Sequence, residues 1–326
     1  MANWLTRTAD TARPPRGHLP RRCCWMALVC FACRCLGAVG CSTAGQAIQP
    51  ATEATIHLNV NLIQLSASVV DPAGKLVPGL DRTDFKLFID GKPQPIISFE
   101  RDDAPVAAGI LVDNSASMNP KSAEVIAAAL AFARASKPID QMFVVHFSGQ
   151  ARLGLPPSQP FTSDVSQLEA GLLTFNAEGT TALYDAVLLA ISHCRLTTLD
   201  RKVLLIISDG GDNSSQASLE DALKLAEKSG IVIYSVGIYD NGDQDRNPQV
   251  LAKFAGLTGG KAFFPKELRD ATSTCVTIAR DIRQQYTLGF EGAEDGDYHR
   301  IQINASHPNF PSLKVLTRAG YLAPNP

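Results

Sequence analysis

The sequence predicts an α/β fold, a doubly wound and mostly parallel sheet with helices on both faces, together with a small accessory β module formed by the flanking segments. Three observations lead to this prediction. Between residues 104 and 285, short apolar runs alternate with stretches of helical period. The runs consist almost entirely of Val, Ile and Leu, as expected for parallel strands that are covered on both faces. The segments on either side, residues 48–103 and 286–326, have strand patterns and turn signals but no helical period.

The first 47 residues have the features of a secretory signal peptide. Basic residues dominate positions 1–22, an apolar stretch follows up to about Val39, and small residues lead to Ala47. The apolar stretch is shorter than the roughly 20 residues that a membrane span needs. We therefore expect cleavage near residue 47 and an exported protein, secreted or located in the periplasm or cell envelope. A wrongly assigned start codon is the second explanation of such a leader.

Cysteines raise two further questions about the exported protein. Cys41 offers an alternative to cleavage near residue 47, since the leader could end before it and a lipid could be attached to its thiol. Lipoprotein signals usually have Leu or a similar residue three places earlier, where this sequence has Ala38, so we favour ordinary cleavage. Six of the eight cysteines leave with the leader, and only Cys194 and Cys275 remain. These two could form one disulfide after export, and the sequence leaves that pairing open.

The body of the protein is acidic. Removing the leader takes away six of the 30 basic residues and one of the 32 acidic residues, which leaves a formal charge of -7. A chain of this charge repels the phosphate backbone of nucleic acids. Nucleic acid is therefore not expected as a partner.

The flanking segments each contain several short strand patterns. Asp90-Gly91 is a strong signal for a hairpin turn, and Pro72-Ala73-Gly74 is another turn signal. Because the termini of a domain often lie close together, we expect the two ends to pair in one accessory sheet. Strands are predicted at residues 55–70, 85–89, 95–99, 286–290, 299–306 and 314–317.

The central region contains the elements of the main sheet. One of its helices begins at Ser218, with Asp221 three residues later, and Gly230 follows its last residue, so both of its ends have typical signals. Buried strands are predicted at residues 106–112, 142–147, 203–207 and 231–238, with a short run at 261–264. Helices are predicted at residues 121–136, 164–173, 182–195, 218–229, 250–257 and 267–285.

Polar residues follow two of the buried strands at the point where each strand ends. Asp113-Asn114-Ser115-Ala116-Ser117 comes directly after the first strand, Ser208-Asp209-Gly210-Gly211-Asp212 comes after the third, and Gly179-Thr180-Thr181 opens a helix between them. Each piece alone is common, since Ser caps helices and Asp-Gly forms turns. Ligands of open α/β sheets bind beyond the carboxyl ends of the strands, so together these loops predict one site. The candidate residues are Asp113, Ser115, Ser117, Thr181 and Asp209.

The residue types at these positions suit a divalent metal ion. Mg²⁺ prefers about six oxygen ligands and keeps several waters. Three hydroxyls would supply neutral oxygens, while Asp113 and Asp209 would supply charge and orient bound water. A site built mainly from neutral ligands leaves the ion electrophilic, so it would favour a carboxylate from another protein. We therefore expect Mg²⁺ or Mn²⁺ as the cofactor.

Residues 106–285 resemble the von Willebrand factor A-type (VWFA) domain and its metal-ion-dependent adhesion site (MIDAS). The matching positions are Asp113, Ser115 and Ser117 in the first loop, Thr181 in the second and Asp209 in the third. The usual second loop ends in Gly-Gly-Thr, whereas Thr180 replaces the second Gly here. Thr180 therefore stays an alternative ligand, although the Ala-Leu-Tyr-Asp-Ala sequence that follows favours Thr181. The resemblance implies a protein-binding module.

A wider resemblance covers nearly all of the chain after the leader. It is similar to the bacterial "VWFA-related" proteins that are abundant in acidobacteria, which implies an exported protein but no particular ligand. The segments that carry this resemblance, besides the metal domain, are Val77-Pro78-Gly79-Leu80, Asp84-Phe85, Asp90-Gly91-Lys92-Pro93, Gln285-Tyr286-Thr287-Leu288-Gly289-Phe290 and Arg318-Ala319-Gly320-Tyr321.

Two other classes of function have weaker signals. Gly259-Gly260-Lys261 lacks the remaining residues of a phosphate-binding loop, because Ala255 and Ala262 stand where Gly and Ser or Thr are needed. Nucleotide binding is therefore not expected. Ser115 has no nucleophile elbow, and we expect His146 to be a satisfied residue of a buried strand, so an enzyme is not expected either.

These observations predict an exported, metal-dependent protein-binding module. Its partner would present an Asp or Glu carboxylate to the metal ion. The alternative is a structural protein of envelope assembly whose metal site is incidental.

Overall fold

The computed structural model describes residues 61–101, 104–174, 179–239 and 246–325. The predicted signal peptide at residues 1–47, Cys41 and the first residues of the N-terminal module lie outside the described residues. Within the described ranges, no helix is both long enough and apolar enough to cross a membrane.

The centre of the fold is a six-stranded sheet in the order β10-β9-β8-β5-β6-β7. All neighbouring strands pair in parallel except β7, which lies antiparallel to β6 at one edge. This arrangement confirms the predicted doubly wound, mostly parallel sheet. The strands are β5 (Val106–Asp113), β6 (Gln141–Phe147), β7 (Ala151–Leu153), β8 (Arg201–Ser208), β9 (Val232–Gly237) and β10 (Ala262–Phe263).

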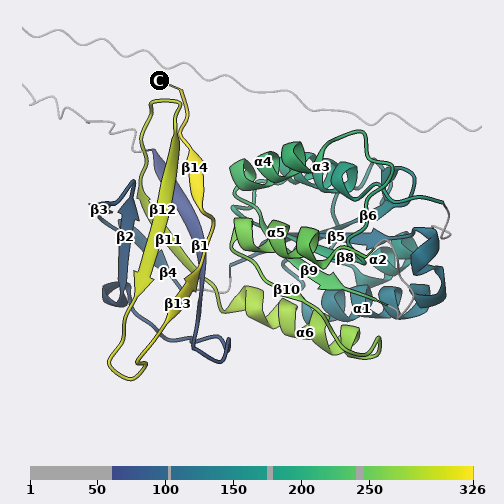
Figure 1. The fold of residues 1–326 in the computed structure, drawn as a ribbon, viewed down its shortest axis with the longest axis horizontal. Helices are drawn as coiled ribbons and strands as arrows, with labels where there is room; N and C mark the ends of the chain where they lie inside the picture. The colour runs from purple at the N-terminus through teal and green to yellow at the C-terminus, as the bar shows by residue number, and fades with distance from the viewer. Residues whose placement is uncertain (1–60, 102–103, 175–178, 240–245, 326) are drawn as a thin grey trace, which may run out of the picture. The chain divides into compact units, whose positions relative to one another are not determined.

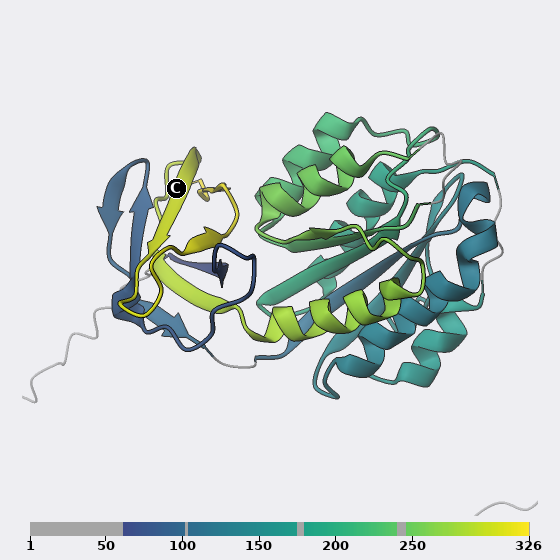
Figure 2. The ribbon, with the colours of Figure 1, turned by 60° about the horizontal axis from the view of Figure 1, so that its bottom comes forward.

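Three helices cover each face of this sheet (Figures 1 and 2). Successive side chains of a strand point to opposite faces, so Ile110 packs with the helices on one side and Leu111 with those on the other. Both faces are therefore buried, as the continuous apolar runs predicted. One face carries α1 (Ser122–Ala135), α2 (Val165–Leu172) and α6 (Asp270–Arg283), and the other carries α3 (Leu183–His193), α4 (Leu219–Ser229) and α5 (Pro248–Thr258).

The two remaining cysteines lie on opposite faces of the sheet. Cys275 in α6 belongs to the same apolar cluster as Ile110, and Cys194 in the 3-10 helix η3 (Cys194–Leu196) belongs to the cluster of Leu111. Both thiols are free, and the sheet between them excludes the disulfide that the sequence left open. Burial raises the pKa of each thiol to about 12, so both stay protonated and unreactive.

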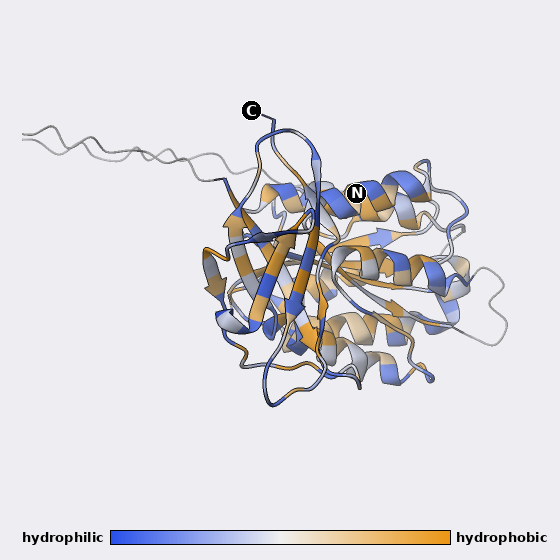
Figure 3. Cartoon of the chain, turned by 60° about the vertical axis from the view of Figure 1, so that its left-hand side comes forward, coloured by the Kyte–Doolittle hydropathy of each residue, from blue (hydrophilic) through white to orange (hydrophobic). Residues whose placement is uncertain are grey.

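Strands from both ends of the chain form a β-sandwich. Its sheets have the orders β13-β1-β11-β4 and β14-β12-β2-β3, and their inner faces share one apolar cluster that includes Leu65, Phe85, Tyr286 and Ile303. Apolar and polar residues alternate along its strands (Figure 3). Its strands are β1 (Leu62–Val70), β2 (Phe85–Ile89), β3 (Lys92–Gln94), β4 (Ser98–Glu100), β11 (Tyr286–Glu291), β12 (Tyr298–Ala305), β13 (Lys314–Leu316) and β14 (Gly320–Leu322).

Strands from the two ends of the chain pair with each other in both sheets. The N-terminal β1 pairs with β11 and β13, and the C-terminal β12 pairs with β2. The two ends therefore pair as expected, but their strands form two sheets and not the one accessory sheet that was expected. Strands β7, β3 and β14, each of three residues, were not predicted.

His299 in β12 connects two turns of the sandwich. Its Nδ1 lies 2.7 Å from Asp90 Oδ2 in the β2–β3 hairpin, and its Nε2 lies 3.0 Å from Asp295 Oδ1 in the loop before β12. The ring stacks on Tyr321, with centroids 5.2 Å apart. These hydrogen bonds raise the pKa of His299 and lower the pKa of each carboxyl group.

We predict that His299→Gln destabilises the protein in a limited pH range. The imidazolium contributes fully below about pH 6.5 and loses its contribution as the pH rises through its raised pKa. The two carboxylates contribute above about pH 4 and lose their contribution as the pH falls further. Thermal unfolding should therefore show the largest loss in Tm between about pH 4 and 6.5 and a small loss at alkaline pH. His307→Gln is the control, because His307 Nδ1 accepts only the backbone N–H of Asn309. A loss of equal size at every pH would contradict the prediction.

Candidate metal site

The first predicted loop begins where β5 ends at the carboxyl edge of the sheet. Asp113 is 2% exposed, and its Oδ1 accepts a hydrogen bond of 2.9 Å from the backbone N–H of Ser115. Its Oδ2 accepts a hydrogen bond of 2.6 Å from Ser208 Oγ, at the end of the neighbouring strand β8. The parallel pairing of β5 with β8 brings these two strand ends together. Both oxygens of Asp113 are therefore fixed in direction.

Four of the five predicted residues form one hydrogen-bonded cluster. Ser117 Oγ donates to Asp209 Oδ2 over 2.7 Å, and the hydroxyls of Ser115 and Ser117 lie 3.1 Å apart. Asp209 Oδ1 accepts the backbone N–H of Gly211 over 2.9 Å. The first and third loops thus meet at one edge of the sheet, with Asp113 joined to them through the backbone of Ser115.

Thr181, the fifth predicted residue, is joined to this cluster through the backbone of its loop. The backbone N–H of Ala116 donates to Gly179 O over 3.2 Å, which ties the first loop to the second. Thr181 is buried, and its N–H donates to Asn213 Oδ1 over 2.8 Å. Thr180 is exposed, and its hydroxyl faces Gly149. Of the two possible ligands in the second loop, the burial favours Thr181.

The third loop also fixes the start of α3. Asp212 Oδ2 accepts the N–H of Tyr184, in the first turn of α3, over 2.9 Å. Asp185 in turn accepts the backbone N–H groups of Gln216 and Ala217, over 2.9 and 3.0 Å. These contacts were not predicted, although Asp212 belongs to the Ser208–Asp212 motif and sits where a carboxylate suits a helix N-terminus. The second and third loops are therefore held against each other from both sides.

The third loop turns sharply directly after Asp209. Gly210 has a φ of +81°, and a Cβ atom there would lie 2.4 Å from the backbone oxygen of Asn247. Only glycine fits this position without movement of the backbone. The turn directs Asp209 toward Ser117 while Gly211 donates back to the same carboxylate.

The two carboxylates repel each other in the absence of a cation. Burial, and secondly the nearby charge of Asp209, raise the pKa of Asp113 from 3.8 to about 6. A bound divalent cation would offset both effects, because it supplies opposite charge at the same place. The electrostatics of the cluster therefore fit a cation.

The donor set also fits the predicted type of metal ion. All candidate ligands are carboxylate or hydroxyl oxygens, which hard ions such as Mg²⁺ and Mn²⁺ prefer. Among the described residues there is no cluster of three or more His, Cys, Asp or Glu side chains that would hold a metal. A metal at this edge of the sheet would consequently depend on hydroxyls and waters as well as on Asp113 and Asp209.

His146 is buried in β6 and contacts backbone and amide groups, as expected for a satisfied core residue. Its Nε2 lies 2.8 Å from Gly171 O, and its Nδ1 lies 2.8 Å from the side-chain amide of Asn114. Burial lowers the pKa of the ring, so it is neutral at pH 7 and carries one N–H. With Nε2–H donating to Gly171 O, Nδ1 accepts, and the amide of Asn114 donates to it in the orientation that turns its NH2 toward the ring. Both ring nitrogens therefore have partners, one an amide and one a backbone carbonyl.

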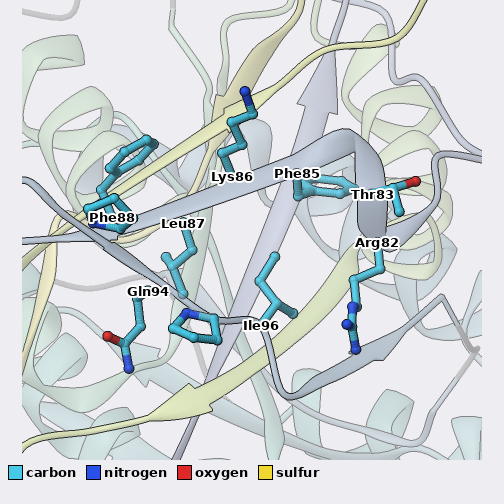
Figure 4. Close-up of a pocket in the computed structure, with 10 residues that line it drawn as sticks. Arg82, Thr83, Phe85, Lys86, Leu87, Phe88, Gln94 and Ile96 are labelled. Carbon is cyan, nitrogen blue, oxygen red and sulfur yellow. The ribbon is translucent and has the colours of Figure 1, made fainter.

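A separate groove lies in the β-sandwich (Figure 4). It has a volume of about 470 Å³ and is lined by residues of η1 (Arg82–Asp84), β2 and β3 and of the segment that follows β3, including Leu87 and Ile96. None of its lining residues is Asp, Glu, His or Cys. We therefore assign no chemistry to this groove.

Comparison with known proteins agrees with this architecture. Residues 109–211 match the family model of the von Willebrand factor type A domain. The central sheet with its helices has the von Willebrand factor type A fold. The matched segment runs from Gly109, within β5, to Gly211, so it includes all five candidate residues.

Solved structures show the same likeness at low sequence identity. A von Willebrand factor type A protein from Catenulispora acidiphila is 13% identical with a TM-score of 0.50, and the match covers 81% of this chain and 75% of that one. The vWF domain of the type V pili tip protein Mfa5 from Porphyromonas gingivalis is 14% identical with a TM-score of 0.47 over 55% and 95% of the two chains. The manganese-loaded TRAP protein of Plasmodium vivax is 15% identical with a TM-score of 0.46 over 74% and 100%. At these identities the likeness concerns the VWFA fold alone. A search of the curated proteins found no match.

We predict that Asp209→Asn stabilises the metal-free protein and abolishes stabilisation by Mg²⁺. The amide oxygen can still accept the N–H of Gly211, and the amide NH2 can donate to the hydroxyl oxygen of Ser117, while the like charge beside Asp113 is removed. Thermal unfolding in EDTA should show a Tm a few degrees above that of the wild type. Added Mg²⁺ should raise the Tm of the wild type only. Asp200→Asn, an exposed position before β8, is the control. A lower Tm in EDTA for Asp209→Asn would contradict the prediction.

Proposed function

We propose that this protein is an exported, metal-dependent protein-binding module of adhesion type. The observation that carries the proposal is the cluster of Asp113, Ser115, Ser117 and Asp209 at the carboxyl edge of the VWFA sheet, joined by hydrogen bonds of 2.7 to 3.1 Å. Thr181 completes the set from the second loop. The cluster combines two carboxylates with neutral oxygens, which suits Mg²⁺ or Mn²⁺.

The residues of the site have two different roles. The hydroxyls of Ser115, Ser117 and Thr181 offer neutral oxygens, while Asp113 and Asp209 are held in fixed directions by donors that surround them. A bound Mg²⁺ or Mn²⁺ supplies an electrophilic position for one further oxygen ligand. With only two carboxylates from its own chain, the site favours an anionic oxygen from outside, and the Asp or Glu of a partner protein provides one.

Two other partner classes fit the molecule less well. The acidic body of the chain disfavours nucleic acid. The segment Gly259-Gly260-Lys261 follows α5 and precedes β10, so it does not form the strand–loop–helix unit of a phosphate-binding loop. A protein with an exposed carboxylate remains the best match, at the cell envelope or outside the cell, as the predicted leader implies. The similarity to bacterial VWFA-related proteins supports the same location.

A structural protein of envelope assembly with an incidental metal site is the second candidate. The observation that favours it is the β-sandwich, whose groove of about 470 Å³ is lined by none of the candidate metal ligands. In that case the partner would bind the sandwich and would not need the metal.

We expect residues 48–326 to bind Mg²⁺ and Mn²⁺ in isothermal titration calorimetry and Asp113→Ala to lose this binding. Asp113 supplies half of the site's charge, so its loss should weaken affinity at least about tenfold. Circular dichroism should show that the variant keeps its fold. Asp200→Ala is the matched control, since it removes one exposed carboxylate before β8 and should bind the metal as the wild type does.

The two candidates give different results. Saturable binding that Asp113→Ala loses and Asp200→Ala keeps supports the binding module. Absence of metal binding by the folded wild type, or equal binding by all three proteins, would favour the assembly protein.

A further inference from the structure

The end of β6 contributes no candidate ligand but contacts both loops beside it. The backbone N–H of Asn114, in the first loop, donates to Phe147 O over 2.7 Å, and the N–H of Ala182, directly after Thr181, donates to Ser148 O over 2.7 Å. These two backbone contacts position the loops relative to β6. Backbone contacts of this kind do not depend on which side chains β6 carries.

One side chain of β6 adds a contact that does depend on residue type. The ring of His146 reaches the side-chain amide of Asn114, which lies between Asp113 and Ser115 in the first loop. On its other side the ring reaches Gly171 O, one of the last carbonyls of α2. Gly171 O also accepts the backbone N–H of Thr174 over 3.3 Å, and Nε2–H of His146 adds a side-chain donor at this end of the helix.

α2 ends in the segment that precedes the second loop. Gly171 O also accepts the hydroxyl of Thr174 over 2.7 Å, so two side chains fix the end of the helix. The chain then continues to Gly179, whose carbonyl accepts the N–H of Ala116. His146 therefore links the first loop, through Asn114, with the end of α2.

The chain leaves room for this ring at two glycines. A Cβ atom at Gly154 would lie 3.0 Å from Nε2 of His146, and one at Gly171 would lie 3.1 Å from Gly154 O. Both distances are tighter than ordinary contacts, so larger residues would displace the ring or the helix end. The ring itself is fully buried, at 0% exposure. Its position is thus determined by close packing as well as by two hydrogen bonds.

We infer that His146 is a positioning residue of the metal site, which holds the Asp113–Ser117 loop against the end of α2 in the arrangement that binds the ion. The inference rests on the proposed function for its metal-binding consequence. A general base is a different role, which would require contact with a reacting group. Residues that orient metal ligands commonly change affinity by about 10- to 100-fold when they are replaced.

A matched control exists in the same domain. His193, the last residue of α3, is also buried, and its Nε2 lies 2.7 Å from Pro160 O. Its ring packs against Phe143 and Phe161, with centroids 4.5 and 4.9 Å away. It stands about 15 Å along α3 from the start of the helix beside Thr181. Replacing it tests the loss of a buried histidine without the loss of the contact to Asn114.

The experiment compares the wild type with His146→Gln, Asn114→Ala and His193→Gln. Calorimetry with Mg²⁺ should show an affinity at least about tenfold weaker for His146→Gln and for Asn114→Ala, and unchanged for His193→Gln. The double variant His146→Gln/Asn114→Ala should lose little more than either single one, because both remove the same contact. Asn114→Ala keeps the test decisive if His146→Gln does not fold.

A second readout needs no metal. Hydrogen exchange in EDTA should be faster at the amides of Ala116 and Ala182 in His146→Gln and Asn114→Ala, but not in His193→Gln, because those two amides report the loop contacts directly. Unchanged exchange and unchanged affinity in His146→Gln would overturn the inference, as would equal changes in His193→Gln. If the wild type binds no Mg²⁺, the proposed function fails, and the exchange result alone decides whether His146 positions the loops.

Discussion

The constraint on which the candidate site depends is the placement of two carboxylates of like charge at adjacent strand ends with little solvent around them. Asp113 is 2% and Asp209 is 1% exposed. Each accepts hydrogen bonds at both oxygens. Two of the donors are backbone N–H groups, which reach the carboxylates only when the loops are correctly folded. The loops can be folded in this way because β5 and β8 are parallel neighbours. The sheet order, the tight turn at Gly210 and the contacts of the third loop to α3 all serve this local arrangement.

The main sheet could be predicted because its pattern is redundant. The long strands are apolar on both faces and alternate with helical stretches, and α4 has typical end signals at Ser218 and Gly230. The sandwich was predicted less fully, since the sequence shows strands but does not show which strands pair. β1 pairs with β11 over six residue pairs that are more than 200 positions apart in the chain, and no local signal encodes that pairing. The cysteines illustrate the same limit, because only the fold shows that a sheet separates them.

The candidate ligands could be named from the sequence because they occur in short loops with a recognisable spacing. Their surroundings could not, since those contacts join residues far apart in the chain. Ser208 was visible next to Asp209, but its hydrogen bond to Asp113 depends on the register of two strands. His146 was expected to be a core residue, and its contact with Asn114 follows only from the parallel pairing of β5 and β6. Local sequence therefore identifies the candidate ligands, whereas the fold identifies the residues that orient them.

The same electrostatics bear on the choice between the two candidate functions. A protein that used only the surface of this fold would gain stability from a neutral residue at either carboxylate position, because burial and mutual repulsion both disfavour the pair. The molecule instead surrounds both carboxylates with donors, an arrangement that fixes the direction of their oxygens. Strain of this kind, kept in an otherwise well-packed sheet, is expected at positions that bind something. An ion with two positive charges removes the repulsion, and for that reason the carboxyl edge favours the metal-dependent module over an assembly protein with an incidental site.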